Sequence, residues 1–374
     1  MPQFWILGLN VFIILLIIAL LRAFPNIMNN DFDGIVVWKN YLWFPILLYI
    51  YSNITKSTNI LLSDYLRQFV NFMCLYIVAN LFFYYIPIPF LITEPHRYWG
   101  RLTVGYPTID VILIGWAIAI VFFSKYEWSK SGFLMRALIL CVGMLMQASG
   151  TGMVFLILLL ILTVFYLKGV WNPQPIFFLK RKRRCFILLL LIFMLGGFFV
   201  LAIFQKQNEE LYDAMIAQVE NRMFILLGME DEAEISVNTM DIREDRMKRA
   251  EDKFLTNGDK KLFGLGYGWI NMKEERANKI LTEDQITMNK VTIGLLGNIV
   301  YFGVLFSLLF YIVKRFRNTS NIYIYISAWF FLLLSSFTSN CLLSFGPINI
   351  WCLVFSLLLS DNKRIRSYGR KFIC

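Results

Sequence analysis

Four basic residues in one short stretch of the chain have the types and the spacing to bind a phosphate group. Arg246, Arg249 and Lys253 lie three and four residues apart, on one face of a helix predicted over residues 242–257, and Arg243 lies three residues before them. Guanidinium groups bind phosphate oxygens in pairs and remain charged at physiological pH. We therefore expect this helix to hold an anionic diphosphate group.

A solvated helix is the alternative for the same stretch. Acidic residues lie four positions before basic ones, a spacing at which opposite charges stabilise an exposed helix. The helix is predicted to begin with Asp241 as its N-cap and to end near Asn257 and Gly258. The two charge pairs are Glu244 with Lys248 and Asp245 with Arg249.

Two other stretches also offer binding chemistry. Gly264, Gly266 and Gly268 alternate with other residues, and glycine permits unusual backbone angles and a close approach of a ligand. Their spacing differs from that of the dinucleotide-binding fingerprint. We expect these glycines to shape a loop over a site, and a plain turn is the alternative. Residues 94–107 contain cationic and aromatic side chains, which are suited to binding phosphates and sugars. The alternative is an aromatic belt at the membrane interface with snorkelling arginines. The cationic candidates in this stretch are His96, Arg97 and Arg101.

The composition favours a membrane protein. The chain has 374 residues, of which 58% are hydrophobic and only 16% charged, whereas soluble domains carry about a quarter charged residues. Its apolar runs are roughly 20 residues long, the length at which a helix crosses the hydrocarbon and satisfies its own backbone groups. We therefore predict an all-α, polytopic transmembrane helical bundle of about 10 spans. They are predicted at residues 4–21, 35–51, 68–88, 108–124, 132–148, 152–168, 185–204, 291–313, 321–337 and 343–360.

The distribution of positive charge orients these spans. With the N-terminus inside, the inner segments hold 18 lysines and arginines and the short outer loops hold three, which is typical of a chain with both ends in the cytoplasm. The net charge of +11 then indicates anchoring to anionic lipid rather than binding to nucleic acid. Lys39, Asp110 and Arg136 fall inside predicted spans, where they either snorkel or serve a function.

A long loop divides the chain into three parts. Residues 1–204 hold spans one to seven, residues 205–290 form an extracytoplasmic loop, and residues 291–374 hold spans eight to ten and a basic cytoplasmic tail. A connection of this length inside a compact protein is usually functional. It is predicted to be helical at 208–227 as well as at 242–257. The single histidine excludes a multi-histidine metal site, and no Walker A, kinase or HExxH motif is present.

Three motifs, taken in order, resemble the O-antigen ligase and polymerase superfamily, the Wzy-type polysaccharide polymerases. The first, residues 100–107, has an arginine, a glycine and a proline that opens a span. The second is the Ser/Gly turn at 147–152, and the third runs from Arg246 through the glycines of 262–268 to Asn289 and residues 301–303. Met288 stands in the neighbourhood where the ligases carry a histidine, so the resemblance favours a polymerase.

The resemblance implies a glycosyltransferase of the bacterial cytoplasmic (inner) membrane. It would polymerise undecaprenyl-diphosphate-linked oligosaccharide repeat units into capsule, exopolysaccharide or O-antigen on the outer face, alongside a flippase and a chain-length regulator. The lipid diphosphate stores the energy, so no cofactor or metal is expected. Arg246 and Arg101 would clamp the diphosphate, assisted by Arg249, Arg97, Arg222 and Arg243. The general base is open, with His96, Glu244 and Asp245 as candidates.

The alternative function is a transporter or flippase of lipid-linked oligosaccharide that performs no chemistry. Such a protein needs charged residues facing a cavity along the whole membrane, and the middles of the predicted spans are nearly free of charge. A sensor or structural subunit of the membrane is a third possibility, and it would tolerate loss of Arg246 and Arg101.

Overall fold

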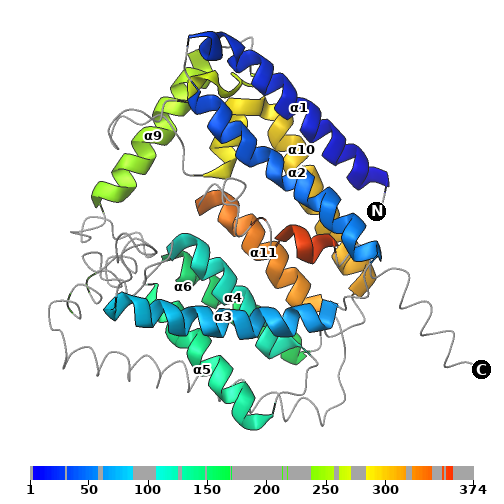
Figure 1. Cartoon of the computed structure of the whole chain (residues 1–374), viewed down its shortest axis with the longest axis vertical. Helices are drawn as coiled ribbons and strands as arrows, with labels where there is room; N and C mark the ends of the chain where they lie inside the picture. Colours follow the sequence, from blue (N-terminus) through cyan, green and yellow to red (C-terminus); the bar gives the residue numbers. More distant parts are fainter. Residues whose placement is uncertain are drawn as a thin grey trace, which may run out of the picture. The chain divides into compact units, whose positions relative to one another are not determined.

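All regular elements that the structure describes are helical, as the composition predicts (Figure 1). The computed structural model describes residues 3–29, 32–57, 62–86, 107–124, 129–147, 150–168, 170, 213, 217, 237–256, 261–270, 284–316, 322–338, 348 and 351–356. Its helices are α1 (Gln3–Met28), α2 (Asp33–Ser57), α3 (Leu62–Tyr85), α4 (Pro107–Phe123), α5 (Lys130–Met146), α6 (Gly150–Lys168), α9 (Val237–Thr256), the 3-10 turn η4 (Tyr267–Trp269), α10 (Gln285–Phe316) and α11 (Ile322–Thr338).

Helices occur at eight of the ten predicted spans, namely the first six, the eighth and the ninth. Within the described residues, three stretches are long and apolar enough to cross a membrane: Leu7–Asn26 of α1, Asp64–Tyr84 of α3 and Gln285–Phe316 of α10. Shorter apolar helices lie in α4, α5, α6 and α11. These helices are consistent with a membrane protein. The predicted span at 185–204 lies outside the described residues, and the one at 343–360 is described only at 348 and 351–356.

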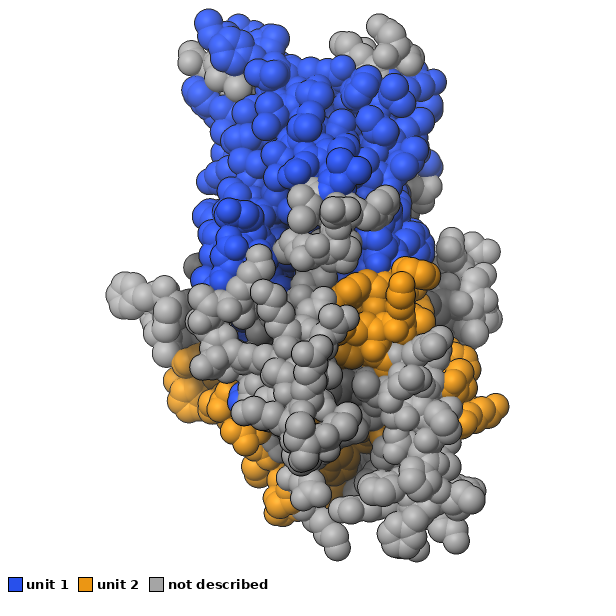
Figure 2. All heavy atoms as spheres, turned by 90° about the vertical axis from the view of Figure 1, so that its right-hand side faces the viewer, with its two compact units in different colours: residues 1–65, 240–308, 333–374 blue, residues 66–239, 309–332 orange. Residues whose placement is uncertain are grey.

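The chain forms two compact units, drawn in separate colours in Figure 2. Unit 1 comprises residues 1–65, 240–308 and 333–374, and unit 2 comprises residues 66–239 and 309–332. Each unit therefore combines segments that are distant in the sequence. Unit 1 joins the first two helices to the end of the long loop and to most of α10.

Unit 2 is built around α4, whose residues 110–121 are all buried. The helix begins at Pro107, at the position where a proline is best tolerated in a helix. The indole nitrogen of Trp116 donates to the carbonyl of Ile324, 3.2 Å away. The rings of Phe155 and Phe331 pack with their centroids 4.5 Å apart. Aromatic contacts of this kind add about 0.5–1.5 kcal/mol beyond the area they bury.

Two charges inside predicted spans bond to neighbouring helices of unit 2. Asp110 is 5% exposed, and one of its carboxylate oxygens accepts from the hydroxyl of Tyr76 at 2.8 Å. The Nε and Nη2 of Arg136 both donate to the side-chain oxygen of Asn71, at 3.0 and 2.9 Å. For Asp110 snorkelling is the wrong interpretation, because this carboxylate is buried and accepts a hydrogen bond from the preceding helix, α3. Lys39, in unit 1, is exposed.

The loop helix α9 begins earlier than the sequence analysis predicts. It starts at Val237, so Asp241 lies inside the helix and the prediction that Asp241 is the N-cap is wrong. The helix ends at Thr256, next to the predicted stop at Asn257 and Gly258. The helix predicted at 208–227 lies outside the described residues except for Asp213 and Ala217, both helical.

Gly294 breaks α10 near its beginning. Its φ of 78° and ψ of −175° are not helical, so the element consists of a first segment, 285–293, and a longer one, 295–316. The predicted span at 291–313 therefore starts within the first segment and crosses the break. A φ of this sign is disfavoured for every residue that has a Cβ atom.

We predict that Gly294→Ala destabilises the protein by at least about 1–3 kcal/mol, the usual cost of holding such a residue at positive φ. The new Cβ would also overlap the carbonyl of Leu262. The matched control is Gly303→Ala in the same helix, where no atom lies within 4 Å of the new Cβ. The control should be neutral or stabilising by up to about 1 kcal/mol. Thermal unfolding in detergent measures both, and equal effects would contradict the role given to Gly294.

Candidate functional site

The first segment of α10 buries an unusual number of polar side chains in unit 1. Polar side chains are mostly exposed in proteins unless they have hydrogen-bond or charge partners. A group of buried polar side chains therefore marks a region that is structurally constrained or functional. Each of these side chains is 7% exposed or less. They are Asp284, Gln285, Thr287, Asn289 and Thr292.

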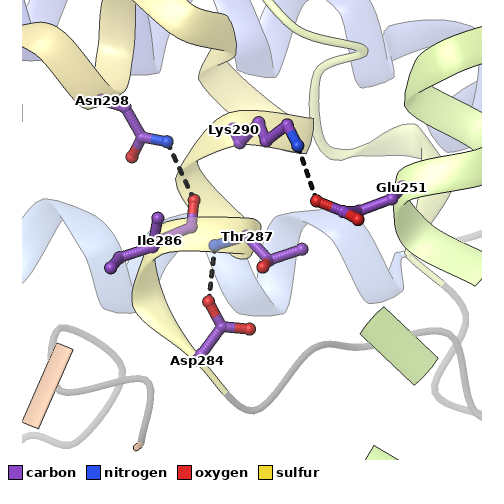
Figure 3. A network of polar contacts seen from close by, with 6 residues as sticks. All are labelled: Glu251, Asp284, Ile286, Thr287, Lys290 and Asn298. Carbon is purple, nitrogen blue, oxygen red and sulfur yellow. Dashed lines mark hydrogen bonds and ion pairs between the residues drawn. The ribbon is translucent and has the colours of Figure 1, made fainter. Parts of the chain in front are cut away.

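Asp284 caps the beginning of α10. Its Oδ1 accepts from the backbone nitrogen of Thr287 at 2.6 Å, which satisfies one of the donors that a helix start leaves open (Figure 3). Burial raises the pKa of the Asp284 carboxyl, and the hydrogen bonds from Thr287 partly oppose this. In the same figure the side chain of Asn298 donates to the carbonyl of Ile286 at 3.1 Å, across the break at Gly294.

A neutral hydrogen-bond network connects this segment to α2. The side-chain nitrogen of Gln285 donates to the hydroxyl of Tyr41 at 2.6 Å and to the side-chain oxygen of Asn289 at 2.8 Å. The ring of Tyr41 packs edge-on against Tyr267, with centroids 5.9 Å apart. Burial raises the pKa of Tyr267 well above its ordinary value, so its phenol is neutral at physiological pH.

The loop helix α9 packs on the same segment of α10. Lys290 forms an ion pair of 2.6 Å with Glu251 (Figure 3). Its Nζ also lies 5.7 Å from the ring centroid of Phe254. Arg246, Ala250 and Phe254 recur every four residues and are all buried, so they form the packed face of α9. Arg246 is only 8% exposed. The buried Arg246 thus shares a face of α9 with Phe254, whose ring lies against Lys290 of α10.

The predicted cationic stripe is divided between buried and exposed positions. Arg246 is buried, Arg249 is intermediate and Lys253 is exposed. The predicted pair of Arg249 with Asp245 is present at 3.8 Å, but both partners are largely in solvent, where such pairs contribute about 0–1 kcal/mol. The side chains of Arg243 and Glu244 lie outside the described residues, although their backbone belongs to α9.

All three candidate glycines approach other parts of unit 1 closely. Gly264 and Gly266 have φ of 74° and 80°, as expected where glycine supplies an unusual backbone angle. A Cβ on Gly264 would meet the backbone of α10, one on Gly266 the backbone of α1, and one on Gly268 the side chain of Asn26. These contacts within the protein already require small residues at 264 and 266.

Several predicted site residues lie outside the described part of the chain. These are His96, Arg97 and Arg101 of the loop at 94–107, and Arg222 of the long loop. Arg246 and the three glycines therefore belong to the same unit, unit 1, and the partnership of Arg246 with Arg101 stays a prediction.

The pattern of apolar runs does not reveal the partners of these residues. It ended the first span at residue 21, whereas Arg22 lies within α1 and donates from Nη1 to the carbonyl of Gly264. It also began the eighth span at residue 291, after Asp284 and Gln285. One signal for this earlier start was present in the sequence, a run of polar residues directly before an apolar span. A helix that enters a membrane from a binding loop would carry its polar residues at that position.

We predict that the Asp284 carboxyl makes stability depend on pH with a defined sign. Because its folded pKa is raised, its contribution is most favourable below the ordinary aspartate pKa of about 3.9. That contribution is lost as the pH rises through the raised value. Asp284→Asn keeps the capping acceptor without the charge, so it should gain stability over the wild type toward neutral pH. Asp284→Ala should lose about 0.5–2 kcal/mol at all pH values.

Thermal unfolding between pH 4 and pH 8 tests this, with the wild type and both variants in the same detergent. A wild-type protein that becomes more stable than Asp284→Asn as the pH rises would contradict the assigned direction.

Comparison with known proteins gives no family for this chain. The sequence matches no protein-family model and no curated protein, and the structure matches no solved structure. The function proposed below is therefore supported by the residues of unit 1 and by the resemblance of motifs in the sequence.

Proposed function

We propose that the chain is a membrane glycosyltransferase that polymerises undecaprenyl-diphosphate-linked oligosaccharide repeat units into surface polysaccharide on the outer face of the membrane. The observation that carries the proposal is the burial of Arg246 on the face of the loop helix α9 that also carries Phe254, whose ring lies against Lys290 of α10. The bond between the anomeric carbon of the growing chain and its lipid diphosphate breaks, and a bond from that carbon to a hydroxyl oxygen of the next unit forms. The lipid diphosphate leaves with the bonding electrons, and the hydroxyl proton passes to a general base, for which His96, Glu244 and Asp245 are the candidates.

The residues suit what this reaction requires of an enzyme. A lipid diphosphate is already a good leaving group, so the protein must neutralise its charge and hold the acceptor hydroxyl in line. A guanidinium binds two phosphate oxygens at once and keeps its charge when buried. Away from solvent, its attraction to an anion is stronger than at an exposed position such as that of Lys253.

The break in α10 supports a site at the level of the lipid headgroups. Residues 295–316 form 22 residues of helix after Gly294, about 33 Å at 1.5 Å per residue, which suffices for the hydrocarbon core of about 30 Å. The segment 285–293 is then not needed to cross the membrane. Its buried polar side chains would lie outside the hydrocarbon, where the diphosphate of a lipid carrier is found.

The other candidate residues keep the roles that the resemblance gives them. Arg101 would share the diphosphate with Arg246, and Arg249, Arg97, Arg222 and Arg243 would add positive charge. Gly264, Gly266 and Gly268 would hold the segment beside the site in the shape that α1 and α10 require. The reaction draws its energy from the lipid donor, so the proposal includes no metal or nucleotide.

We predict that Arg246→Ala abolishes long-chain polysaccharide while leaving the protein in the membrane at normal abundance. Removing a positioned electrostatic group typically lowers a reaction rate by about 10²–10³-fold. The matched control is Lys248→Ala, which removes an exposed cation from the same helix and should leave the glycan ladder normal. Arg101→Ala should behave as Arg246→Ala does. Gel sizing of surface glycan from a complemented deletion strain gives the readout.

The lipid fraction of the same strains separates polymerisation from transport. A failed polymerase leaves single repeat units on their lipid, facing outward, where an externally added glycosidase can digest them. A failed flippase leaves them facing inward and protected. Protected units in Arg246→Ala would contradict the proposed enzyme and favour a transporter, and a normal ladder would remove Arg246 from the site.

A further inference from the structure

Two short segments of unit 1 pair through their backbones where α10 is broken. They are residues 261–266 and 291–296, and together we call them the glycine clasp. The second segment begins 30 residues after the first. Both segments contain Gly-Leu at their fourth and fifth positions. The four bonds are Leu295 N to Lys261 O (3.0 Å), Leu296 N to Leu262 O (3.2 Å), Leu265 N to Val291 O (2.8 Å) and Gly266 N to Thr292 O (3.0 Å).

The clasp compensates for the broken helix. In an unbroken α10 the nitrogens of Leu295 and Leu296 would bond to the carbonyls of Val291 and Thr292. Here the two nitrogens bond to the first segment, and the two carbonyls accept from it. These four backbone groups therefore keep hydrogen-bond partners at the break, as a backbone near the hydrocarbon requires.

The glycines at the centre of the clasp depend on each other. A Cβ on Gly264 would lie 2.5 Å from the nitrogen of Gly294, and a Cβ on Gly294 would lie 2.5 Å from the nitrogen of Gly264. Both have positive φ. Only glycine at both positions lets the two backbones approach this closely.

Side chains of α1 donate hydrogen bonds to one backbone carbonyl of the first segment and to one in the turn that follows it. Arg22 donates from Nη1 to Gly264, and Asn26, one turn later, donates from its side-chain nitrogen to Gly268 at 2.7 Å. The guanidinium also lies 6.0 Å from the ring centroid of Phe263. An arginine at the end of an apolar helix ordinarily snorkels to lipid phosphates, whereas Arg22 directs a donor to the backbone of the clasp.

We propose that Arg22 is a positioning residue of the site formed by α9 and α10. The first segment of the clasp follows α9 after four residues, since α9 ends at Thr256 and the segment begins at Lys261. Arg22 fixes this segment at Gly264, and the ion pair of Lys290 with Glu251 fixes α9 itself against α10. The two attachments together hold Arg246 in place. This role for Arg22 in the reaction rests on the proposed function, but its effect on the position of α9 does not.

A cross-link between α9 and α10 measures that position directly. Glu251→Cys with Lys290→Cys replaces the ion pair by two thiols, in a chain whose six native cysteines are changed to alanine. Both sites are partly exposed and therefore accessible to a mild oxidant. A protease site inserted between residues 271 and 283 makes the cross-linked protein appear as one band and the open protein as two on a non-reducing gel.

We predict that Arg22→Ala lowers the yield of this disulfide at least threefold, and that Asn26→Ala lowers it less. Arg22→Lys keeps a charged donor and should restore most of the yield. The control is Leu21→Ala, which truncates an exposed neighbour on α1 and should change nothing. The unfolding midpoints of all variants show whether a lower disulfide yield comes from a displaced α9 or from general unfolding. If Arg22→Ala does not fold, Asn26→Ala tests the attachment of α1 to the same stretch of chain.

Polymerisation by the variants in the natural cysteine background, with lipid-linked repeat units in proteoliposomes, supplies the second readout. A displaced Arg246 should lower kcat for polymerisation about tenfold or more in Arg22→Ala, with a smaller change in KM. An unchanged disulfide yield in Arg22→Ala would overturn the inference, whatever the activity. A reduced yield in a chain that makes no polymer even as the wild type would support the positioning role and contradict the proposed function.

Discussion

Backbone hydrogen bonding at one position, the break in α10 at Gly294, constrains the rest of unit 1. A helix that loses two of its bonds needs other partners for four backbone groups, and residues 261–266 supply all four. That requirement draws the end of the long loop onto α10, and the approach of two backbones requires glycine at 264 and 294. The positions of α9 and of the turn η4 follow from it, because both belong to the same continuous loop.

The polar residues of unit 1 depend on this arrangement. Since the first segment of α10 is separated from the longer one, it can carry Asp284, Gln285 and Asn289 in its buried face without placing them in the middle of an apolar span. Side chains from α2 and α9 then complete their surroundings, through the hydroxyl of Tyr41 and the carboxylate of Glu251. The proposed glycosyltransferase would need such a polar region beside the bilayer, held by apolar helices.

The sequence predicts the helices of this fold well and their connections poorly. Apolar runs of about 20 residues have few alternatives to a helix in lipid, so eight predicted spans coincide with helices of the structure. The proline at 107 marks the start of α4 correctly. The break at Gly294 could not be predicted in the same way, because a glycine inside an apolar run is compatible with an unbroken helix. Its cause lies in residues 30 positions away, and local patterns carry no information about them.

The same limit applies to the candidate site. Arg246 could be selected from its residue type and its spacing to other basic residues. Whether it is buried depends on Ala250 and Phe254, which follow at intervals of four residues and give this face of α9 apolar side chains that pack rather than remain in solvent. The glycines of 264–268 could be recognised as unusual, but their contacts with Arg22 and Asn26 join positions 242 residues apart. No pattern in a single sequence connects such positions.

That separation of 242 residues has a consequence for biosynthesis. At a translation rate of about 5–20 residues per second, roughly 10–50 seconds pass between the synthesis of Arg22 and that of its acceptor carbonyl. During this interval α1 is already made, but the carbonyl that accepts from the guanidinium of Arg22 is not. The first helix of the chain therefore waits for a partner from the end of the long loop, and unit 1 can close only late in the assembly of the protein.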